Sequence, residues 1–184
     1  MNIVGISGSP ALRSRSNWLL QLAQTRLEGV ARRNDSIAVR ALDPTALLSA
    51  DVNAASVREA VDRIAAADLV IVATPIYKAA YSGLLKLFLD LLPQEGLRGK
   101  TVLPLATGGS LAHLLALDYA LKPVLSALGA RDILDGVFAT DPQLVAHESG
   151  GYVPDAGLLA RVDRALEPLL AVRGISETLA QERA

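Results

Sequence analysis

The sequence contains no cysteine, so disulfide bonds, thiolate metal sites and thiol nucleophiles are excluded. Neither sign of charge dominates, because 18 lysines and arginines are balanced by 19 aspartates and glutamates and the formal net charge is −1. No block of like charge offers a footprint for nucleic acid or for a membrane surface. We therefore expect small ligands, with no nucleic acid and no membrane among the partners.

Long apolar runs are also missing. No apolar segment reaches about 18 residues without charges or helix breakers, so we expect no membrane-spanning helix. The first residues, Met1-Asn2-Ile3, lack the basic segment and the apolar stretch of a signal peptide. We expect a cytoplasmic protein.

Aromatic residues are scarce, with one tryptophan, four tyrosines and two phenylalanines in 184 residues. Hydrophobic residues nevertheless make up 51% of the chain, so alanine and leucine must supply most of the core. Tyr77, Tyr81 and Tyr119 take up much of the small aromatic content, and all three lie close to segments that are expected to face a ligand.

The spacing of apolar residues predicts five repeats of a strand followed by a helix. Runs typical of strands occupy residues 2–6, 37–42, 69–73, 101–106 and 133–138. Helical spacing occurs at 17–32, 54–67, 83–92, 111–128 and 156–172. This alternation predicts an α/β fold, a doubly wound five-stranded parallel sheet with helices on both faces.

Boundary signals accompany several of these elements. Asn53 or Ser56 is expected to cap the second helix, Gly129 to end the fourth, and Asp155 to cap the fifth. Residues 141–157 are rich in glycine, proline and polar side chains, which indicates a surface loop or a lid. We expect one domain over residues 1–174 and a polar tail over residues 175–184.

The loop after the first strand is rich in small hydroxyl residues and leads into a helix. Unpaired backbone amides and the positive end of the helix dipole at such a helix start can hold a phosphate. Arg13 and Arg15 would add charge-assisted bonds. The spacing fits neither a dinucleotide loop nor a nucleoside triphosphate loop, which leaves a mononucleotide. An ordinary capped helix remains the alternative. The polar residues of this cradle are Ser7, Ser9, Ser14, Ser16 and Asn17.

Two further loops meet the same edge of the predicted sheet, where ligands bind in open parallel sheets. One contains Pro75, Ile76, Tyr77 and Lys78, and combines a rigid proline with an aromatic edge. The other, Thr107-Gly108-Gly109-Ser110, offers hydroxyls and accessible backbone amides. Both suit a planar ring such as a flavin. A tight turn into the fourth helix is the alternative for the second loop.

At these residues the chain resembles the NAD(P)H-dependent FMN reductases of flavodoxin-like fold, most closely those that serve two-component alkanesulfonate monooxygenases. The resemblance covers nearly the whole chain to about residue 140. It implies the strand order 2-1-3-4-5. The segments that carry it are Gly8-Ser9-Pro10 with Ser14-Arg15-Ser16, VATPIYKAAYSG at 72–83, LPLATGGS at 103–110, and AHLLALDYALKPVLSAL at 112–128.

The resemblance implies the FMN phosphate at Ser9, Arg15, Ser16 and Asn17, the last of which is often serine in the family. It implies the flavin ring between the loop of Pro75 and the loop of Gly109. The implied reaction is hydride transfer from NADPH or NADH to FMN, followed by release of reduced flavin to an FMNH₂-dependent monooxygenase. Since the cofactors perform this chemistry, we assign no catalytic acid or base and no metal.

Tyr119 lies four residues before Pro123 within a helical pattern. Proline has no amide proton, so a local π-helix is one way to repair the hydrogen bonding, and a kinked helix is the other. The resemblance implies a π-helix at a subunit interface. We expect Tyr119, Tyr81 and His113 to take part in flavin exchange or in that interface.

The third and fourth helical segments are apolar on more than one face, which predicts self-association. The resemblance implies a tetramer. Asp90 and Lys122 are candidates for interface ion pairs or for solvated surface charges.

Two other functions share this scaffold. A quinone or azo reductase cannot be separated from a flavin reductase by fold alone. A non-enzymatic FMN electron carrier would usually offer an acidic docking face, which the balanced charge of this chain disfavours.

Overall fold

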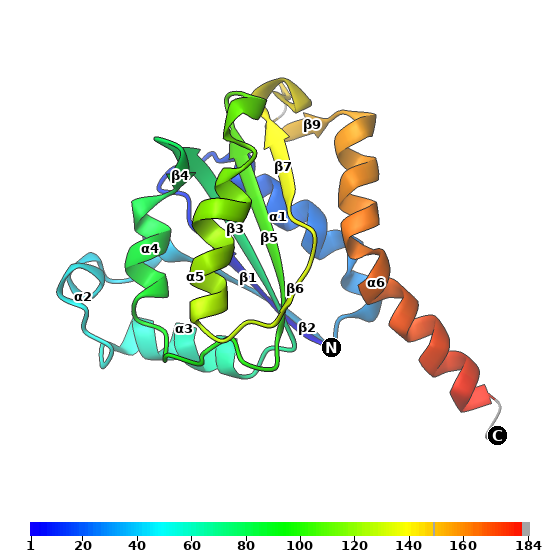
Figure 1. The fold of residues 1–184 in the computed structure, drawn as a ribbon, viewed down its shortest axis with the longest axis horizontal. Helices are drawn as coiled ribbons and strands as arrows, with labels where there is room; N and C mark the ends of the chain where they lie inside the picture. The colour runs from blue at the N-terminus through cyan, green and yellow to red at the C-terminus, as the bar shows by residue number, and fades with distance from the viewer. Residues whose placement is uncertain (149, 182–184) are drawn as a thin grey trace.

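A parallel sheet forms the centre of the molecule (Figure 1). The computed structural model describes residues 1–148 and 150–181, with side chains through Ala171. The strands run in the order β2-β1-β3-β5-β6, and β7 also pairs with β5, which confirms the predicted order. These strands are β1 (Asn2–Ser7), β2 (Arg33–Ala38), β3 (Leu69–Tyr77), β5 (Thr101–Gly108), β6 (Asp132–Ile133) and β7 (Val137–Thr140).

The expected fifth strand is therefore two short strands rather than one. Both β6 and β7 pair with β5 in parallel. The interruption lies beside Pro104 of β5, which has no N–H to donate to a neighbouring strand. Gly136 packs tightly at this point, because a Cβ on it would lie 3.1 Å from the Pro104 carbonyl oxygen.

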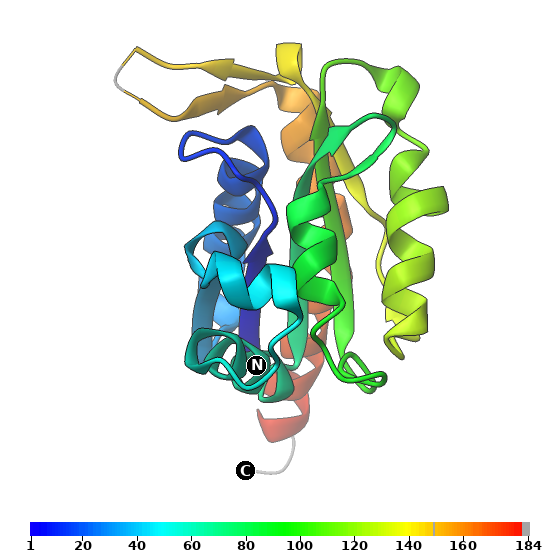
Figure 2. The same cartoon turned by 90° about the vertical axis from the view of Figure 1, so that its left-hand side faces the viewer.

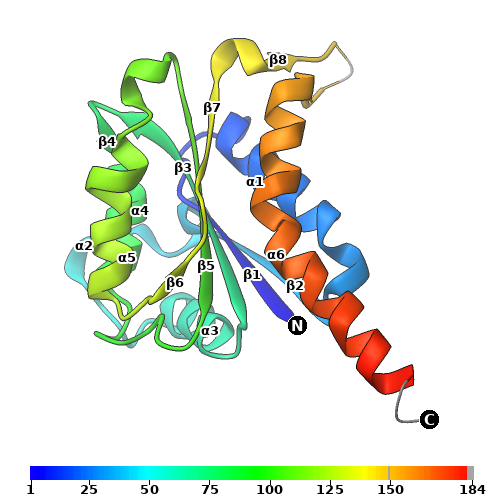
Figure 3. The same ribbon diagram turned by 45° about the vertical axis from the view of Figure 1, so that its right-hand side comes forward.

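Helices cover both faces of the sheet, as Figure 3 shows. On one face lie α1 (Arg15–Arg26) and α6 (Ala156–Gln181). On the other lie α2 (Pro44–Ser49), α3 (Ala55–Ala65), α4 (Gly83–Leu89) and α5 (Lys122–Ala127). Successive residues of the buried strands contribute to the two cores in turn, because strand side chains alternate between faces. In β3, Ile71 belongs to the core under α1 and α6, and Val72 to the core under α3, α4 and α5.

The second strand was predicted four residues too late. The prediction was 37–42, but the strand spans Arg33–Ala38, and Val39–Ala41 form a 3₁₀ turn. As an edge strand, β2 carries exposed polar residues that give no apolar signal. The chain also forms the unpredicted short 3₁₀ turn Glu28–Val30 after α1.

The predicted caps of the second helix were wrong. α3 begins after Ala54 without a side-chain cap, and the Ser56 hydroxyl instead accepts a bond from the Asp43 amide at 3.3 Å. Asp43 caps the unpredicted helix α2, where its carboxylate accepts from Thr45 N at 2.8 Å. The other two boundary predictions are confirmed: Gly129 has φ +89° just beyond α5, and Asp155 accepts from Leu158 N at 2.6 Å.

The expected helix over 111–128 consists of three pieces. A 3₁₀ turn, η3 (Leu111–His113), precedes the π-helix η4 (Leu117–Leu121), and α5 follows. The Lys122 amide donates to the Leu117 carbonyl, five residues back. The π-helix that Pro123 predicted around Tyr119 is confirmed.

Residues 141–157 contain a hairpin rather than a plain loop. After a 3₁₀ turn (Asp141–Gln143), β8 (Leu144–Ala146) pairs with β9 (Tyr152–Pro154) in antiparallel fashion. Figure 2 shows this hairpin projecting over the loop that follows β1. α6 then runs to Gln181, through most of the predicted tail, whose last residues 182–184 lie outside the described part. No helix in the described residues combines the length and apolar character needed to cross a membrane.

The apolar helices are better covered within one chain than their sequences indicate. Leu85, Phe88 and Leu89 of α4 are buried, and the exposed apolar residues instead gather around η3 at Leu111, Leu114 and Leu115. The candidate interface charges pair locally. Asp90 binds Lys86 at 2.6 Å, and Lys122 binds Asp118 at 2.6 Å.

Candidate active site

Two of the three predicted loops are bonded to each other at the carboxyl edge of the sheet. The Gly8 amide donates to the Ala73 carbonyl at 2.8 Å, and the Ser82 hydroxyl donates to the Gly8 carbonyl. The Ser82 amide in turn donates to Thr74 Oγ1 at 3.0 Å. Ser82, which the sequence reasoning missed, thus fixes the loop after β1 to the loop after β3. Its signal was a serine at the start of α4, which it also caps.

The loop after β1 gathers hydroxyls at the first turn of α1. Ser14 caps the helix, and its Oγ accepts from Asn17 N at 3.3 Å and lies 2.9 Å from Ser16 Oγ. Ser9 and Ser16 are buried, and Ser9 Oγ accepts from Ala11 N at 3.2 Å. Buried hydroxyls beside free helix-start amides are donors of the kind that bind a phosphate.

Arg15 faces the β8–β9 hairpin. Its Nε donates to the Leu144 carbonyl at 3.0 Å, its Nη1 lies 3.5 Å from Asp141, and its guanidinium lies 5.2 Å from the centre of the Tyr152 ring. A residue predicted to hold phosphate therefore also ties the phosphate loop to the hairpin, a contact that no local pattern could reveal.

The third strand was predicted to end at residue 73, but β3 continues to Tyr77, so Pro75, Ile76 and Tyr77 belong to the strand and a tight turn follows them. Tyr77 pairs with Ala80 of β4 (Ala80–Tyr81), and the two turn residues between them are left-handed, Lys78 at φ +50° and Ala79 at φ +63°. Such a turn matches the strand twist, but it normally uses asparagine or glycine. It holds Pro75 half-buried, Ile76 buried and Tyr77 about half exposed at the edge of the sheet.

The two glycines at the end of β5 have different roles, and Gly108 is the last residue of the strand while Gly109 follows it. A Cβ on Gly108 would lie 2.9 Å from Phe138 Cζ, so this glycine is required by the packing of the protein itself. A Cβ on Gly109 would meet no atom within 4 Å. Gly109 and Ser110 are exposed, and Thr107 is buried beneath them. The open space over Gly109 suits the close approach of a planar ligand.

The residues assigned to exchange lie beside this loop. Ser110 Oγ accepts from Ala112 N at 3.3 Å and so begins the 3₁₀ turn that contains half-exposed His113. β4 packs against the π-helix, which places Tyr81 near the segment of Tyr119. Burial raises the pKa of the Tyr81 phenol, which stays protonated at neutral pH as a hydrogen-bond donor. Among the described residues no group of three or more acidic or histidine side chains could hold a metal.

Residues 1–144 match the family model of NADPH-dependent FMN reductases. The chain belongs to this family. It is an NAD(P)H:FMN oxidoreductase, and its cofactors are FMN and NADPH or NADH, as predicted.

Named relatives of this FMN reductase use either nucleotide. The chain is 48% identical over 168 residues to an FMN reductase (NADPH) of Escherichia coli strain K12, covering 91% of this chain and 87% of the relative. It is 30% identical over 175 residues to the NADH-dependent FMN reductase SfnF of Pseudomonas putida, covering 93% and 92%. A solved NADH:FMN oxidoreductase in its apo form superposes with a TM-score of 0.80 at 43% identity, covering 90% of this chain and 86% of that one.

Proposed function

We propose that the three loops bind FMN, with the phosphate at Ser9, Arg15, Ser16 and Asn17. The ring would lie between the loop of Pro75, Ile76, Tyr77 and Lys78 and the loop of Thr107, Gly108, Gly109 and Ser110. The open space over Gly109 and the buried hydroxyls at the start of α1 support this placement.

When bound, FMN would supply the acceptor for a hydride from the nicotinamide, which is chemistry of the cofactors themselves. The residues of the chain bind and orient the two partners. Tyr77 and Ile76 would cover one edge of the ring, and the amides of Gly109 and Ser110 would donate to its polar edge.

We further propose that this FMN reductase supplies reduced flavin to a partner monooxygenase of the sulfonate type. The observation that carries this proposal is the exposure of the ring-binding edge, where Tyr77 is 51%, Leu111 62% and Tyr119 78% exposed. A flavin bound at such an edge can leave without unfolding of the core. The π-helix around Tyr119 replaces regular helix beside this edge, and π-segments are often found at functional sites. We assign Tyr119, Tyr81 and His113 to flavin exchange.

The test is whether flavin acts as a substrate. Purified protein is passed through gel filtration, its bound FMN is measured, and NADPH oxidation is followed at increasing FMN. We expect little retained flavin, a rate that saturates with added FMN, and product formation when an FMNH₂-dependent alkanesulfonate monooxygenase is added. One FMN retained per subunit together with a rate independent of added FMN would show a resident cofactor and contradict the proposal.

We also propose a tetramer in the cytoplasm. The exposed leucines in and just after η3, beside the π-helix, support association of subunits. The absence of cysteine and the use of a nicotinamide nucleotide suit a reducing cell interior. Sedimentation velocity at micromolar protein tests the assembly, and a monomer with and without FMN would exclude it.

A further inference from the structure

A cavity adjoins the phosphate loop, and the function proposed so far assigns no ligand to it. It measures about 320 Å³ and lies between α1 and the β8–β9 hairpin, the two segments that Figure 2 shows one above the other. Ser14, Asn17, Trp18 and Gln21 line its α1 side. Their spacing places them on one face of the helix. The volume falls within the range of small-molecule sites.

Two aromatic rings form one wall of this cavity. Trp18 and Tyr152 meet edge to face, with ring centroids 6.5 Å apart and planes at 75°. The hairpin backbone closes over the indole, because a Cβ on Gly151 would lie 3.3 Å from Trp18 Nε1. The flat, half-buried surfaces of Trp18 and Tyr152 suit contact with a purine base.

The cavity also carries an unused positive charge. Arg13, which the sequence predicted at the FMN phosphate, lines this cavity, is exposed, and makes no hydrogen bond or ion pair within the described part of the chain. Arg15, two residues on, has three partners. Among the described residues that line the cavity, none is acidic. The combination of a free guanidinium, polar side chains and no carboxylate favours an anionic ligand, and a planar guanidinium suits a phosphate in particular.

The position of the cavity indicates which ligand reaches it. Ser14 and Asn17 belong both to this cavity and to the turn proposed to hold the FMN phosphate. On the other side, the hairpin continues from β7, whose last residue Thr140 is paired with Gly108 beside the ring site. A ligand that begins at the flavin ring and extends past the phosphate loop would end in this cavity.

We propose that the cavity binds the 2′-phosphoadenosine end of NADPH, with Arg13 on the 2′-phosphate and the Trp18 and Tyr152 rings against the adenine. This inference rests on the proposed placement of FMN, because the nicotinamide at the other end of NADPH must meet the flavin ring. Arg13 is then the residue that selects NADPH over NADH, which lacks the 2′-phosphate.

The binding test uses the fact that Trp18 is the single tryptophan of the chain. Flavin-free protein is titrated with adenosine 2′,5′-bisphosphate and, separately, with 5′-AMP, and tryptophan emission is followed. We expect both to change the emission, and the bisphosphate to bind at least about 10-fold more tightly, the usual scale of a charge-assisted contact. Arg13→Ala should remove that preference and Arg13→Lys should keep part of it. Equal binding of the two nucleotides to the parent, or no response of Trp18, overturns the proposal.

Steady-state kinetics separate this inference from the function itself. FMN is kept saturating, so that any contribution of Arg13 to FMN binding does not limit the rate. Under this condition Arg13→Ala should raise the KM for NADPH about 10-fold and raise the KM for NADH far less. The matched control is Arg58→Ala, which removes an exposed arginine from α3 on the opposite face of the sheet and should change neither. Activity of the variant with NADH reports on the FMN reductase function, and the KM for NADPH reports on the Arg13 proposal. An equal loss with both nucleotides contradicts a role on the 2′-phosphate.

Discussion

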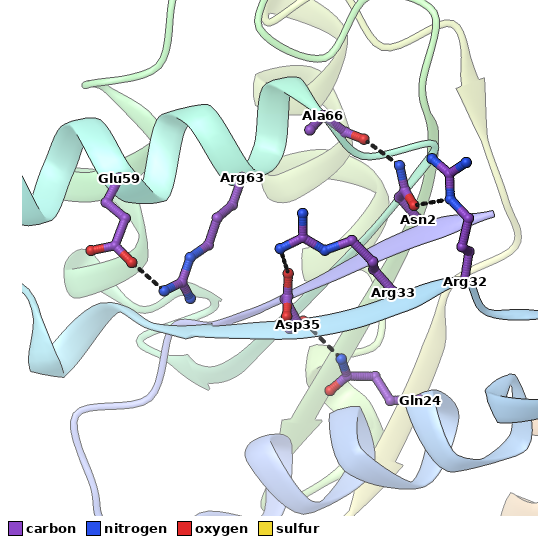
Figure 4. Close-up of polar contacts among 8 residues, drawn as sticks. All are labelled: Asn2, Gln24, Arg32, Arg33, Asp35, Glu59, Arg63 and Ala66. Atoms are coloured by element: carbon purple, nitrogen blue, oxygen red, sulfur yellow. Dashed lines mark hydrogen bonds and ion pairs between the residues drawn. The ribbon is translucent and has the colours of Figure 1, made fainter.

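The two ends of the sheet differ in whether their polar side chains have partners within the protein. At the amino end, two arginines are paired within the protein, as Figure 4 shows: Arg33 pairs with Asp35 at 3.2 Å, and Arg63 pairs with Glu59. Arg32 Nε donates to the Asn2 side chain at 3.3 Å. At the carboxyl end, Arg13 has no partner in the described part, and Tyr77 and Gly109 face open space.

Cavity size does not distinguish the two ends. The cavity at the amino end measures about 430 Å³, larger than the one beside Arg13, but Arg33 and Arg63 line it together with their own acidic partners. A ligand there would have to displace an ion pair before it could use either charge. Volume therefore does not identify the functional cavity, and the two cavities differ instead in that the arginines of the larger one are paired with acidic residues while Arg13 of the smaller one is not paired within the described residues.

The largest expected effect is on flavin affinity at the carboxyl end. Arg15→Ala should weaken FMN binding about 10- to 100-fold, since a hydrogen bond to a charged group contributes about 1.5–3 kcal/mol. Riboflavin, which lacks the phosphate, should bind the parent and the variant equally. The measurement is a flavin fluorescence titration. If riboflavin binding falls as much as FMN binding, Arg15 acts only by holding the hairpin through Leu144 and Tyr152.

The two glycines at the end of β5, Gly108 and Gly109, allow the same comparison between neighbouring residues. Gly108→Ala should lower the free energy of unfolding by about 1–3 kcal/mol, because the added methyl overpacks against Phe138. Gly109→Ala should leave stability unchanged within about 0.5 kcal/mol and weaken FMN binding instead. Urea denaturation measures the unfolding free energy of each variant, and flavin titration measures its FMN affinity. A Gly109→Ala variant that binds FMN like the parent would show that the open space holds no ring.

These predictions use the candidate site that the sequence indicated, whose binding roles are proposals. The phosphate loop, the two ring loops and the π-helix before Pro123 were each predicted from local sequence. Each prediction used residue types with a specific local effect: hydroxyls at a helix start, glycines that leave backbone amides accessible, and a proline that cannot donate a helical hydrogen bond. What escaped prediction depends on contacts distant in sequence or on unusual backbone. The Lys78-Ala79 turn has no glycine or asparagine to announce it, and β8 and β9 are only three residues long each. The bond from Arg15 to Leu144 joins residues 129 positions apart.

A smaller effect is expected from Asp141, which pairs with Arg15 and would compete for it with the FMN phosphate proposed there. Asp141→Asn removes the charge of the ion pair at 3.5 Å, a half-exposed contact worth little in stability. It should tighten FMN binding about 2- to 5-fold and leave riboflavin binding unchanged, since the freed guanidinium meets less competition. Weaker FMN binding in this variant would mean that Asp141 orients Arg15 toward the phosphate instead of drawing it away.

The smallest effect is expected at the amino end, where the pair between Arg63 and Glu59 lies one turn apart on α3. Exposed pairs at this spacing contribute about 0.3–0.5 kcal/mol, so Arg63→Ala should lower the unfolding free energy by no more than that. Its FMN affinity and its KM values for NADPH and NADH should equal those of the parent, because the charge it removes was already satisfied within the protein. The same titration and kinetics used for Arg13→Ala provide the measurement. A change in the FMN affinity or in either KM would mean that the amino end takes part in binding. The pairing of a charge within the protein would then not distinguish a structural arginine from a ligand-binding one.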